Sequence, residues 1–165
     1  IRLHGQYIAD ALEGKRGAPK VNPETRPMQG IGAYMILINT SQMLRESIDA
    51  PGMTEWIDRS IEKIRTDFMK PEMQVVLETT GPGGAFIDHA DRRTLNPGHA
   101  IEAAWFVMEE ARLRGGDGEL LAMGRTILDW MWERGWDKEY GGLLYFADAK
   151  GLPVQEYWHD MKFWW

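Results

Sequence analysis

The sequence predicts an all-α fold of antiparallel helical hairpins, because strongly apolar helices alternate with amphipathic ones along the chain. The apolar helices are expected over 28–47 and 97–114, and the amphipathic ones over 54–69 and 118–134. A helix that is apolar nearly all round is buried on most sides, whereas a single apolar stripe leaves the other face in solvent. Apolar helices recur about every 60 to 70 residues, which favours an α/α toroid or a superhelix of hairpins. A plain helical bundle explains the alternation less well.

Capping residues and breakers mark where these helices begin and end. Asn96 is a good N-cap and Pro97 suits the first helical position, whereas Gly115 and Gly116 stop that helix. Gly135 is expected as the C-cap of the next helix. The other expected segments are a helix end over 1–13, a loop over 14–27, a strand over 73–79, a loop over 81–95, a strand over 143–147 and a helix from about residue 157.

Composition and charge restrict the classes of function. The 165 residues carry a net charge of −6 without a basic stripe, which argues against a nucleic-acid partner. The chain has no cysteine, which excludes disulfides and thiolate metal sites and fits a reducing, cytoplasmic location. No apolar run approaches the roughly 20 residues that cross a bilayer, so no membrane contact is expected. We expect one domain over 1–165, whose two ends read as cuts through a longer protein.

The strongest functional signal lies at the start of the helix over 97–114. His99 is expected at the third helical position, with Glu102 three residues later on the same face. The helix N-terminus disfavours an imidazolium whereas the Glu102 carboxylate favours it, and these opposing effects would leave His99 poised to exchange a proton. Histidine and glutamate also ligate metals, but the chain has four histidines in all and no cysteine, so no metal site is expected.

Three motifs carry a resemblance to a known family. They are Asn-Pro-Gly-His-Ala-Ile-Glu-Ala-Ala-Trp-Phe over 96–106, Gly-Trp-Asp over 135–137 followed by Tyr-Gly-Gly-Leu-Leu-Tyr-Phe over 140–146, and Met-Lys-Phe-Trp-Trp over 161–165. A weaker match runs from Arg26 to Thr40. In this order and spacing the motifs resemble the N-acylglucosamine 2-epimerase family, also called renin-binding protein in animals.

The resemblance implies an (α/α)6 toroid of which this chain is the central part. It implies an enzyme that interconverts N-acetyl-D-glucosamine and N-acetyl-D-mannosamine by removing and returning the C2 proton of the open-chain sugar. His99 and Glu102 would be catalytic, with a second catalytic histidine outside this chain. No cofactor is implied, although ATP is an allosteric activator of several members, and a homodimer is expected. The implied substrate-binding residues are Arg93, Asn96, Trp105, Lys162, Trp164 and Trp165, with one of the paired tryptophans facing the sugar.

Three other functions are compatible with the sequence. Cellobiose 2-epimerases and aldose–ketose isomerases of the same fold typically carry a histidine-containing pattern on the preceding inner helix, where this chain has Tyr-Met-Ile-Leu over 34–37. A glycosidase or lyase would need two carboxylates across the scissile bond, and only Glu102 is well placed for that. A non-catalytic interaction protein of the renin-binding kind is the third alternative.

Overall fold

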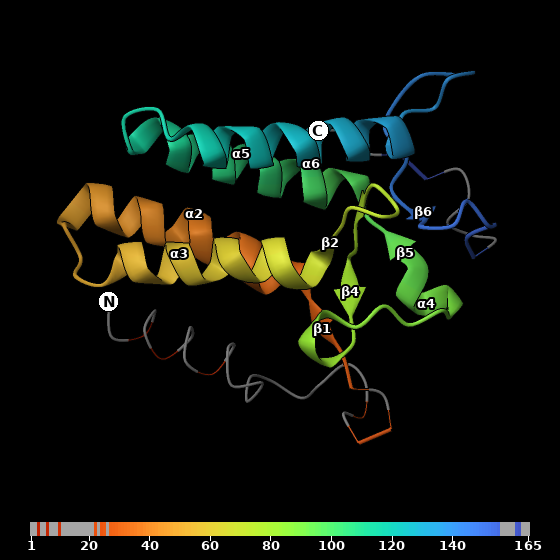
Figure 1. Ribbon diagram of the computed structural model, residues 1–165, viewed down its shortest axis with the longest axis horizontal. Helices are drawn as coiled ribbons and strands as arrows, with labels where there is room; N and C mark the ends of the chain where they lie inside the picture. The colour runs from red at the N-terminus through yellow and green to blue at the C-terminus, as the bar shows by residue number, and fades with distance from the viewer. Residues whose placement is uncertain are drawn as a thin grey trace.

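Four long helices lie in two antiparallel pairs in the computed structural model, and short strands gather at one end of them (Figure 1). The structure describes residues 27–155 together with Leu3, Gln6, Asp10, Asn22, Glu24, Thr25, Met161 and Lys162. Within this part the long helices are α2 (Ile31–Ile48), α3 (Met53–Lys63), α5 (Pro97–Leu113) and α6 (Gly118–Gly135). The chain continues from α3 into a π-helical turn over Ile64–Phe68.

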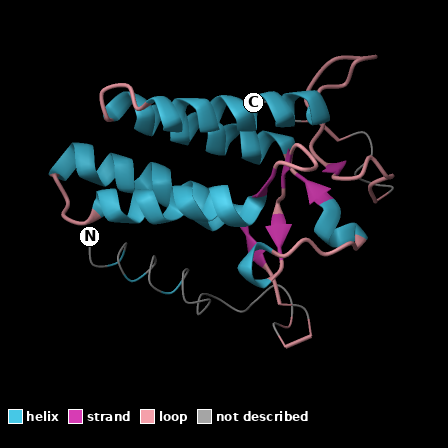
Figure 2. Ribbon diagram, viewed as in Figure 1, coloured by secondary structure: helices cyan, strands magenta, loops and turns pink. Residues whose placement is uncertain are grey.

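The strands of the described part are two residues long and pair as three antiparallel ladders at one end of the helices (Figure 2). The pairs are β1 (Gln29–Gly30) with β4 (Thr79–Thr80), β2 (Met69–Lys70) with β3 (Val75–Val76), and β5 (Thr94–Leu95) with β6 (Ala147–Asp148). A 3-10 turn over Pro82–Gly84 and the short helix α4 (Ala90–Arg93) lie between β4 and β5. Because β1 leads directly into α2 and β5 nearly directly into α5, the ladders fix where both helices begin.

The hydrophobic core lies between the two helix pairs, and α2 and α5 supply much of it. Small residues on α5, among them Ala103 and Ala104, are fully buried, which lets the neighbouring helices approach closely. α3 buries one stripe and exposes its charged face, as its amphipathic pattern predicts. α2 departs from the prediction, because its apolar side chains Ile36 and Met43 are 41% and 59% exposed. Fully buried apolar residues include Ile31, Leu37, Ile38, Ile57, Ile64, Phe68, Val75, Leu77, Leu95, Val107, Ile127 and Met131.

The four predicted long helices are confirmed to within a few residues, but the predicted strands are wrong in extent. The expected strand over 73–79 is two separate strands, β3 and β4. They separate because Leu77 donates its backbone N–H to Phe68 and Glu78 bonds to other segments. The strand expected over 143–147 is reduced to isolated bridges and β6, and the loop expected over 81–95 contains α4 and β5. Most of the helix predicted from residue 157 lies outside the described residues, as does most of the segment 1–27. At Lys162 the prediction is wrong, because this residue pairs with Leu144 in an isolated antiparallel bridge.

Two glycines of α6 allow it to pack against α5. A Cβ on Gly124 would lie 2.4 Å from Cγ of Met108, and one on Gly135 would lie 2.5 Å from Cβ of Pro97. Gly135 is not the C-cap that the sequence predicts, because α6 extends through it and Trp136 caps the helix. Its missing side chain is needed instead for contact with Pro97, the first residue of α5.

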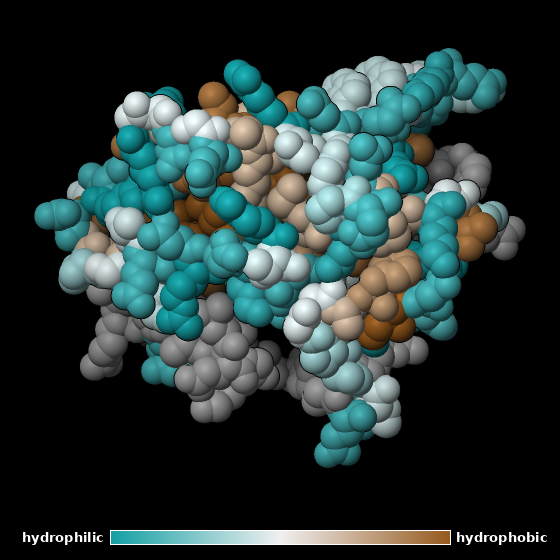
Figure 3. Space-filling view, viewed as in Figure 1, coloured by the Kyte–Doolittle hydropathy of each residue, from teal (hydrophilic) through white to brown (hydrophobic). Residues whose placement is uncertain are grey.

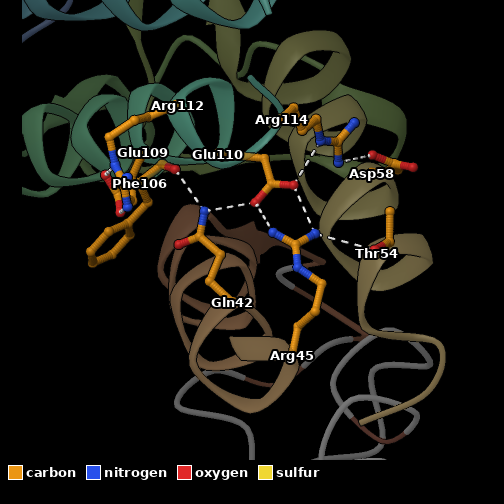
Figure 4. A network of polar contacts seen from close by, with 9 residues as sticks. All are labelled: Gln42, Arg45, Thr54, Asp58, Phe106, Glu109, Glu110, Arg112 and Arg114. Atoms are coloured by element: carbon orange, nitrogen blue, oxygen red, sulfur yellow. Dashed lines mark hydrogen bonds and ion pairs between the residues drawn. The ribbon is translucent and has the colours of Figure 1, made fainter. Parts of the chain in front are cut away.

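A buried carboxylate near the C-terminal end of α5 joins three helices (Figure 4). Because α5 begins beside the strands, this carboxylate lies toward the other end of the helices. Glu110 on α5 is 0% exposed and accepts hydrogen bonds from Gln42 and Arg45 of α2 and from Arg114. Arg114 also bonds to Asp58 of α3. Burial alone would raise the pKa of Glu110, but the hydrogen bonds from Arg45, Arg114 and Gln42 outweigh it and hold that pKa below its ordinary value.

Hydrophilic residues cover most of the face seen in Figure 3, and hydrophobic ones show between the two helix pairs and near the strands. Several large apolar side chains are exposed. On the inner helices these include Ile36 and Met43 of α2 and Trp105 of α5. No helix of the described part combines the length and the apolar character that a membrane-spanning helix requires.

Candidate active site

The candidate site lies at the strand end, where α2 and α5 both begin. Asn96 precedes α5 with extended backbone angles, and its side-chain oxygen accepts a hydrogen bond from the backbone N–H of His99 at 3.2 Å. Pro97 occupies the first helical position, so His99 is the third residue of the helix, as predicted. Asn96 itself is 3% exposed. Its side chain therefore fixes the helix start and with it the position from which the imidazole projects.

Glu78, from the connection between β3 and β4, contacts the imidazole of His99. Both carboxylate oxygens of Glu78 lie 3.2 Å from Nδ1 of His99. The two side chains are 24% and 30% exposed, so the pair is accessible from solvent but partly desolvated. A histidine and a carboxylate at this distance form either a neutral hydrogen bond or an ion pair, depending on whether the ring is protonated.

This contact raises the pKa of His99 above its ordinary value of 6.5. The hydrogen bond to Glu78 is the largest cause, burial of the ring acts in the opposite direction, and the charges of Glu78 and Glu102 add to the increase. As the sequence predicts, the charge of Glu102 favours the imidazolium of His99. The carboxylate hydrogen-bonded to the ring is that of Glu78, which the sequence does not predict.

Glu102 and Trp105 follow His99 along α5 at steps of three residues. They lie on a strip that winds around the helix, and Glu102 is partly exposed. Trp105 is 59% exposed, with its ring centroid 5.1 Å from that of Phe106. An exposed indole three residues after a glutamate on the same helix is a surface on which the apolar face of a sugar can stack.

Arg93, a predicted substrate-binding residue, is held by two carboxylates. Its Nε donates to Asp148 of β6 at 2.9 Å, and its Nη1 donates to Asp88 at 2.9 Å. Its backbone oxygen accepts from Ala149 at 2.8 Å, and the side chain is 13% exposed. Hydrogen bonds from Lys150 and Arg93 lower the pKa of Asp88. Arg93 thus joins β6 to the segment that leads into α5.

Lys162 lies beside the loop that follows α6. Its Nζ donates to Asp137 Oδ2 and to the backbone oxygen of Gly141, each at 2.6 Å. The hydrogen bond from Lys162, with backbone N–H bonds from Tyr140 and Glu139, lowers the pKa of Asp137 to about 2. Gly142 adopts φ +93°, and a Cβ there would lie 3.1 Å from Cδ of Lys162. The predicted residues Trp164 and Trp165 lie outside the described residues.

A further polar cluster lies beside the β1–β4 ladder. Asp67, on the π-helical turn, accepts hydrogen bonds from Gln29 at 2.6 Å and from Lys63 at 2.8 Å. Gln29 also donates to Thr80 at 3.1 Å and accepts from the hydroxyl of Tyr34 at 3.4 Å. These bonds lower the pKa of Asp67 although its burial acts to raise it. The cluster joins the π-helical turn after α3 to the β1–β4 ladder, whose strand β1 precedes α2.

The comparison with known proteins decides the family. The profile of N-acylglucosamine 2-epimerase (GlcNAc 2-epimerase) matches residues 10–165. The chain belongs to the N-acylglucosamine 2-epimerase family. It is 36% identical over 152 residues to N-acylglucosamine 2-epimerase from Mus musculus, covering 90% of this chain and 34% of the relative. It is 33% identical over 157 residues to the Homo sapiens protein of that name, covering 91% and 34%. The chain therefore spans about a third of the length of these curated relatives.

Solved structures confirm the fold of this family member. The structure of cellobiose 2-epimerase from Spirochaeta thermophila superposes with a TM-score of 0.65 at 13% identity, covering 93% of this chain and 41% of that one. A sugar epimerase from a ruminal bacterium gives a TM-score of 0.64 at 15% identity, covering 78% and 31%. The helical hairpins described above are thus part of an (α/α)6 toroid.

The residue of this epimerase-family site that the sequence does not reveal is Glu78. It lies 21 residues before His99, so helical spacing cannot connect the two. The sequence feature that could have pointed to Glu78 is its position directly after the buried apolar run Val75, Val76 and Leu77. An acidic side chain at the end of such a run is expected to lie at the edge of the core. In the described part of the chain, no group of three or more histidine, aspartate or glutamate side chains is placed to hold a metal ion.

Proposed function

We propose that this member of the N-acylglucosamine 2-epimerase family forms part of a sugar epimerase that interconverts N-acetyl-D-glucosamine and N-acetyl-D-mannosamine. The observation that carries the proposal is the placement of His99 on the first turn of an inner helix, partly exposed and hydrogen-bonded to Glu78. The match to the family profile over residues 10–165, a range that contains the Asn-Pro-Gly-His stretch of this chain, supports it.

The reaction needs a group that removes the C2 proton and a group that returns one to the opposite face. When the sugar ring opens, the C1 aldehyde acidifies the neighbouring C2–H bond, and deprotonation gives an enolate. Each acid/base group must work in both directions, so its pKa should lie near neutrality, and histidine meets that requirement. His99 is our candidate for one of the two groups.

The geometry favours Nε2 of His99 as the nitrogen that exchanges the proton, because Nδ1 faces the carboxylate of Glu78. Glu102 adds negative charge close to the ring, and Trp105 offers an exposed aromatic face further along α5. Among the other predicted substrate contacts, Asn96 caps α5 while Arg93 and Lys162 are held in ion pairs. Their contact with sugar stays a prediction, as does that of Trp164 and Trp165.

The chain spans about a third of its curated relatives, and we propose that it forms the central part of the toroid. The second acid/base histidine would then come from a segment outside this sequence. Activation by ATP, homodimer formation and a cytoplasmic location stay predictions.

The test is exchange of the C2 proton in deuterated solvent, followed by NMR in an intact enzyme that contains this segment. Wild type should incorporate deuterium at C2 of N-acetylmannosamine and form N-acetylglucosamine, whereas His99→Asn should lose exchange. His89→Asn is the matched control, because that histidine is 63% exposed and caps α4. Exchange at the wild-type rate in His99→Asn would remove the proposed role. Turnover of mannose or cellobiose instead would assign the enzyme to another branch of the fold.

A further inference from the structure

Glu78 is held by its backbone between the beginnings of the two inner helices. Its N–H donates to the backbone oxygen of Thr94 in β5 at 3.4 Å, and its oxygen accepts from the N–H of Ile31, the first residue of α2, at 3.1 Å. The preceding residue, Leu77, is 0% exposed and anchors the segment in the core. The position of the Glu78 carboxylate is therefore set by the same segments that set the start of α2 and α5.

The carboxylate of Glu78 determines which nitrogen of the His99 imidazole carries the hydrogen. An ionised carboxylate has acceptor sites and no donor, so Nδ1 of His99 must carry a hydrogen to bond to it. Both oxygens lie 3.2 Å from Nδ1, so the N–H is directed at the carboxylate as a whole. In the neutral ring the hydrogen at Nδ1 leaves the lone pair at Nε2, which is the form of histidine that accepts a proton there.

We propose that Glu78 is a positioning residue that fixes the orientation and the Nδ1–H tautomer of His99, so that Nε2 is the atom that exchanges a proton with substrate. The part of the proposal that concerns substrate rests on the proposed function, whereas orientation and tautomer are properties of the protein alone. Glu78 acts through His99 and makes no contact with the sugar in this scheme.

Glu102 is less suited to this role. It lies three residues after His99 on the same helix, and in the described structure it acts on the ring as a charge, whereas Glu78 bonds to it directly. Two ionised groups of the described structure raise the pKa of the ring: Glu78, from the β3–β4 connection, and Glu102, from α5 itself. Both favour the imidazolium, but only the loss of Glu78 would also remove the acceptor that keeps the hydrogen of the neutral ring on Nδ1.

Two substitutions separate the effects of charge and hydrogen bond. Glu78→Gln keeps an amide oxygen that can accept the Nδ1 hydrogen but removes the charge. Glu78→Leu removes both. Glu72→Gln, which alters an exposed glutamate in the turn before β3, is the matched control. The His99 ring is observed by NMR in the intact protein labelled with 13C and 15N histidine, and its signals are assigned with His99→Asn.

In Glu78→Gln the pKa of His99 should fall by about one unit, as expected when a neighbouring opposite charge is removed, with the Nδ1–H tautomer retained. In Glu78→Leu the neutral ring should become a mixture of tautomers. Glu72→Gln should match wild type. An unchanged titration of His99 in Glu78→Gln overturns the proposal, and that variant decides the question if Glu78→Leu does not fold.

The C2 exchange assay then links the contact to activity. In Glu78→Gln the limb of the pH–rate profile that reports the pKa of His99 should move by the same amount as the NMR titration. In Glu78→Leu the exchange rate should fall at least tenfold. If the ring titration shifts while no sugar is exchanged by wild type, the positioning role holds and the proposed function fails. If wild type exchanges the proton and the Glu78 variants keep both its rate and its profile, the positioning role is overturned.

Discussion

Glu110→Gln is expected to destabilise the protein strongly, although it changes a carboxylate to an amide of the same shape. One oxygen of Glu110 accepts from Arg45 Nη1 at 2.9 Å and Arg114 Nε at 2.7 Å, and the other accepts from Gln42 Nε2 at 3.0 Å and Arg45 Nη2 at 2.8 Å. A glutamine places an NH2 group at one of these positions, whichever way its amide is turned. Two of the four hydrogen bonds are then lost, because the NH2 group is a donor and faces the two N–H groups that donated to the oxygen at that position.

The size of the effect follows from burial. Breaking a buried charge pair by removing one partner costs about 3–5 kcal/mol, because the remaining charge loses its compensation. The side chains of Arg45 and Arg114 are 22% and 29% exposed, so water can partly solvate them, and we expect the lower end of the range. A loss of about 3 kcal/mol with a urea m-value near 2 kcal/mol/M lowers the unfolding midpoint by about 1.5 M.

The measurement is urea unfolding at pH 7, followed by circular dichroism, for wild type, Glu110→Gln and Glu109→Gln. Glu109 is the matched control because it neighbours Glu110 on α5 but pairs with an arginine that is 67% exposed, so its loss should have a much smaller effect. Equal destabilisation by the two variants would refute the reasoning. Because the pKa of Glu110 is lowered, its stabilisation is present above the ordinary value of 4.5 and is lost as the pH falls below it. The difference between wild type and Glu110→Gln should therefore shrink below about pH 4.5.

Two other predictions follow from packing and from the site. Gly124→Ala should lower stability by about 1–3 kcal/mol in thermal unfolding, because its Cβ would lie 2.4 Å from Met108 and 3.0 Å from a backbone oxygen of α5. Gly118→Ala, at an open position of α6, should instead raise it by about 0.4–1 kcal/mol, and equal effects would contradict the packing argument. Because Glu78 raises the pKa of His99, the stability from this pair is fully present below about pH 6.5 and is lost as the pH rises through the folded value. Wild type should thus exceed Glu78→Gln by more at pH 6 than at pH 9 in urea unfolding, and the reverse order would contradict the ion pair.

The parts of the fold that the sequence predicts are those governed by local rules. The start of α5 follows from Asn96 and Pro97 alone, because a cap and a proline act within one turn. The single buried stripe of α3 follows from hydrophobic periodicity, whereas the exposure of Ile36 and Met43 on α2 does not. The strands were less predictable, since each is two residues long. β1 and β5 pair with strands that lie beyond two long helices in the chain, whereas β2 and β3 form a short hairpin across the turn over 71–74.

The candidate site shows the same division. His99 is predicted because its motif is contiguous, whereas Glu78 depends on the folding of the segment between β3 and β4 over the start of α5. At Gly135 the predicted helix end is nearly correct, but the predicted reason for the glycine is wrong. The helix ends near it as predicted, but the constraint on its side chain comes from Pro97, 38 residues earlier, which no local pattern reveals.

The two ends of the inner helices α2 and α5 carry opposite partial charges. We expect the ion pairs at their C-terminal ends to contribute mainly to stability and the groups at their N-terminal ends mainly to the chemistry of the site. α2 and α5 both begin at the strand end, so the positive ends of their dipoles favour negative charge where Glu78 lies. At the other end Arg45 lies in the last turn of α2 and Arg114 caps α5, so cations face the negative ends and converge on Glu110. We therefore expect Glu110→Gln to lower the urea midpoint while leaving the NMR titration of His99 unchanged, and Glu78→Gln to shift that titration with a smaller change in midpoint. A shift of the His99 titration in Glu110→Gln would show that the two ends are coupled and would contradict this separation.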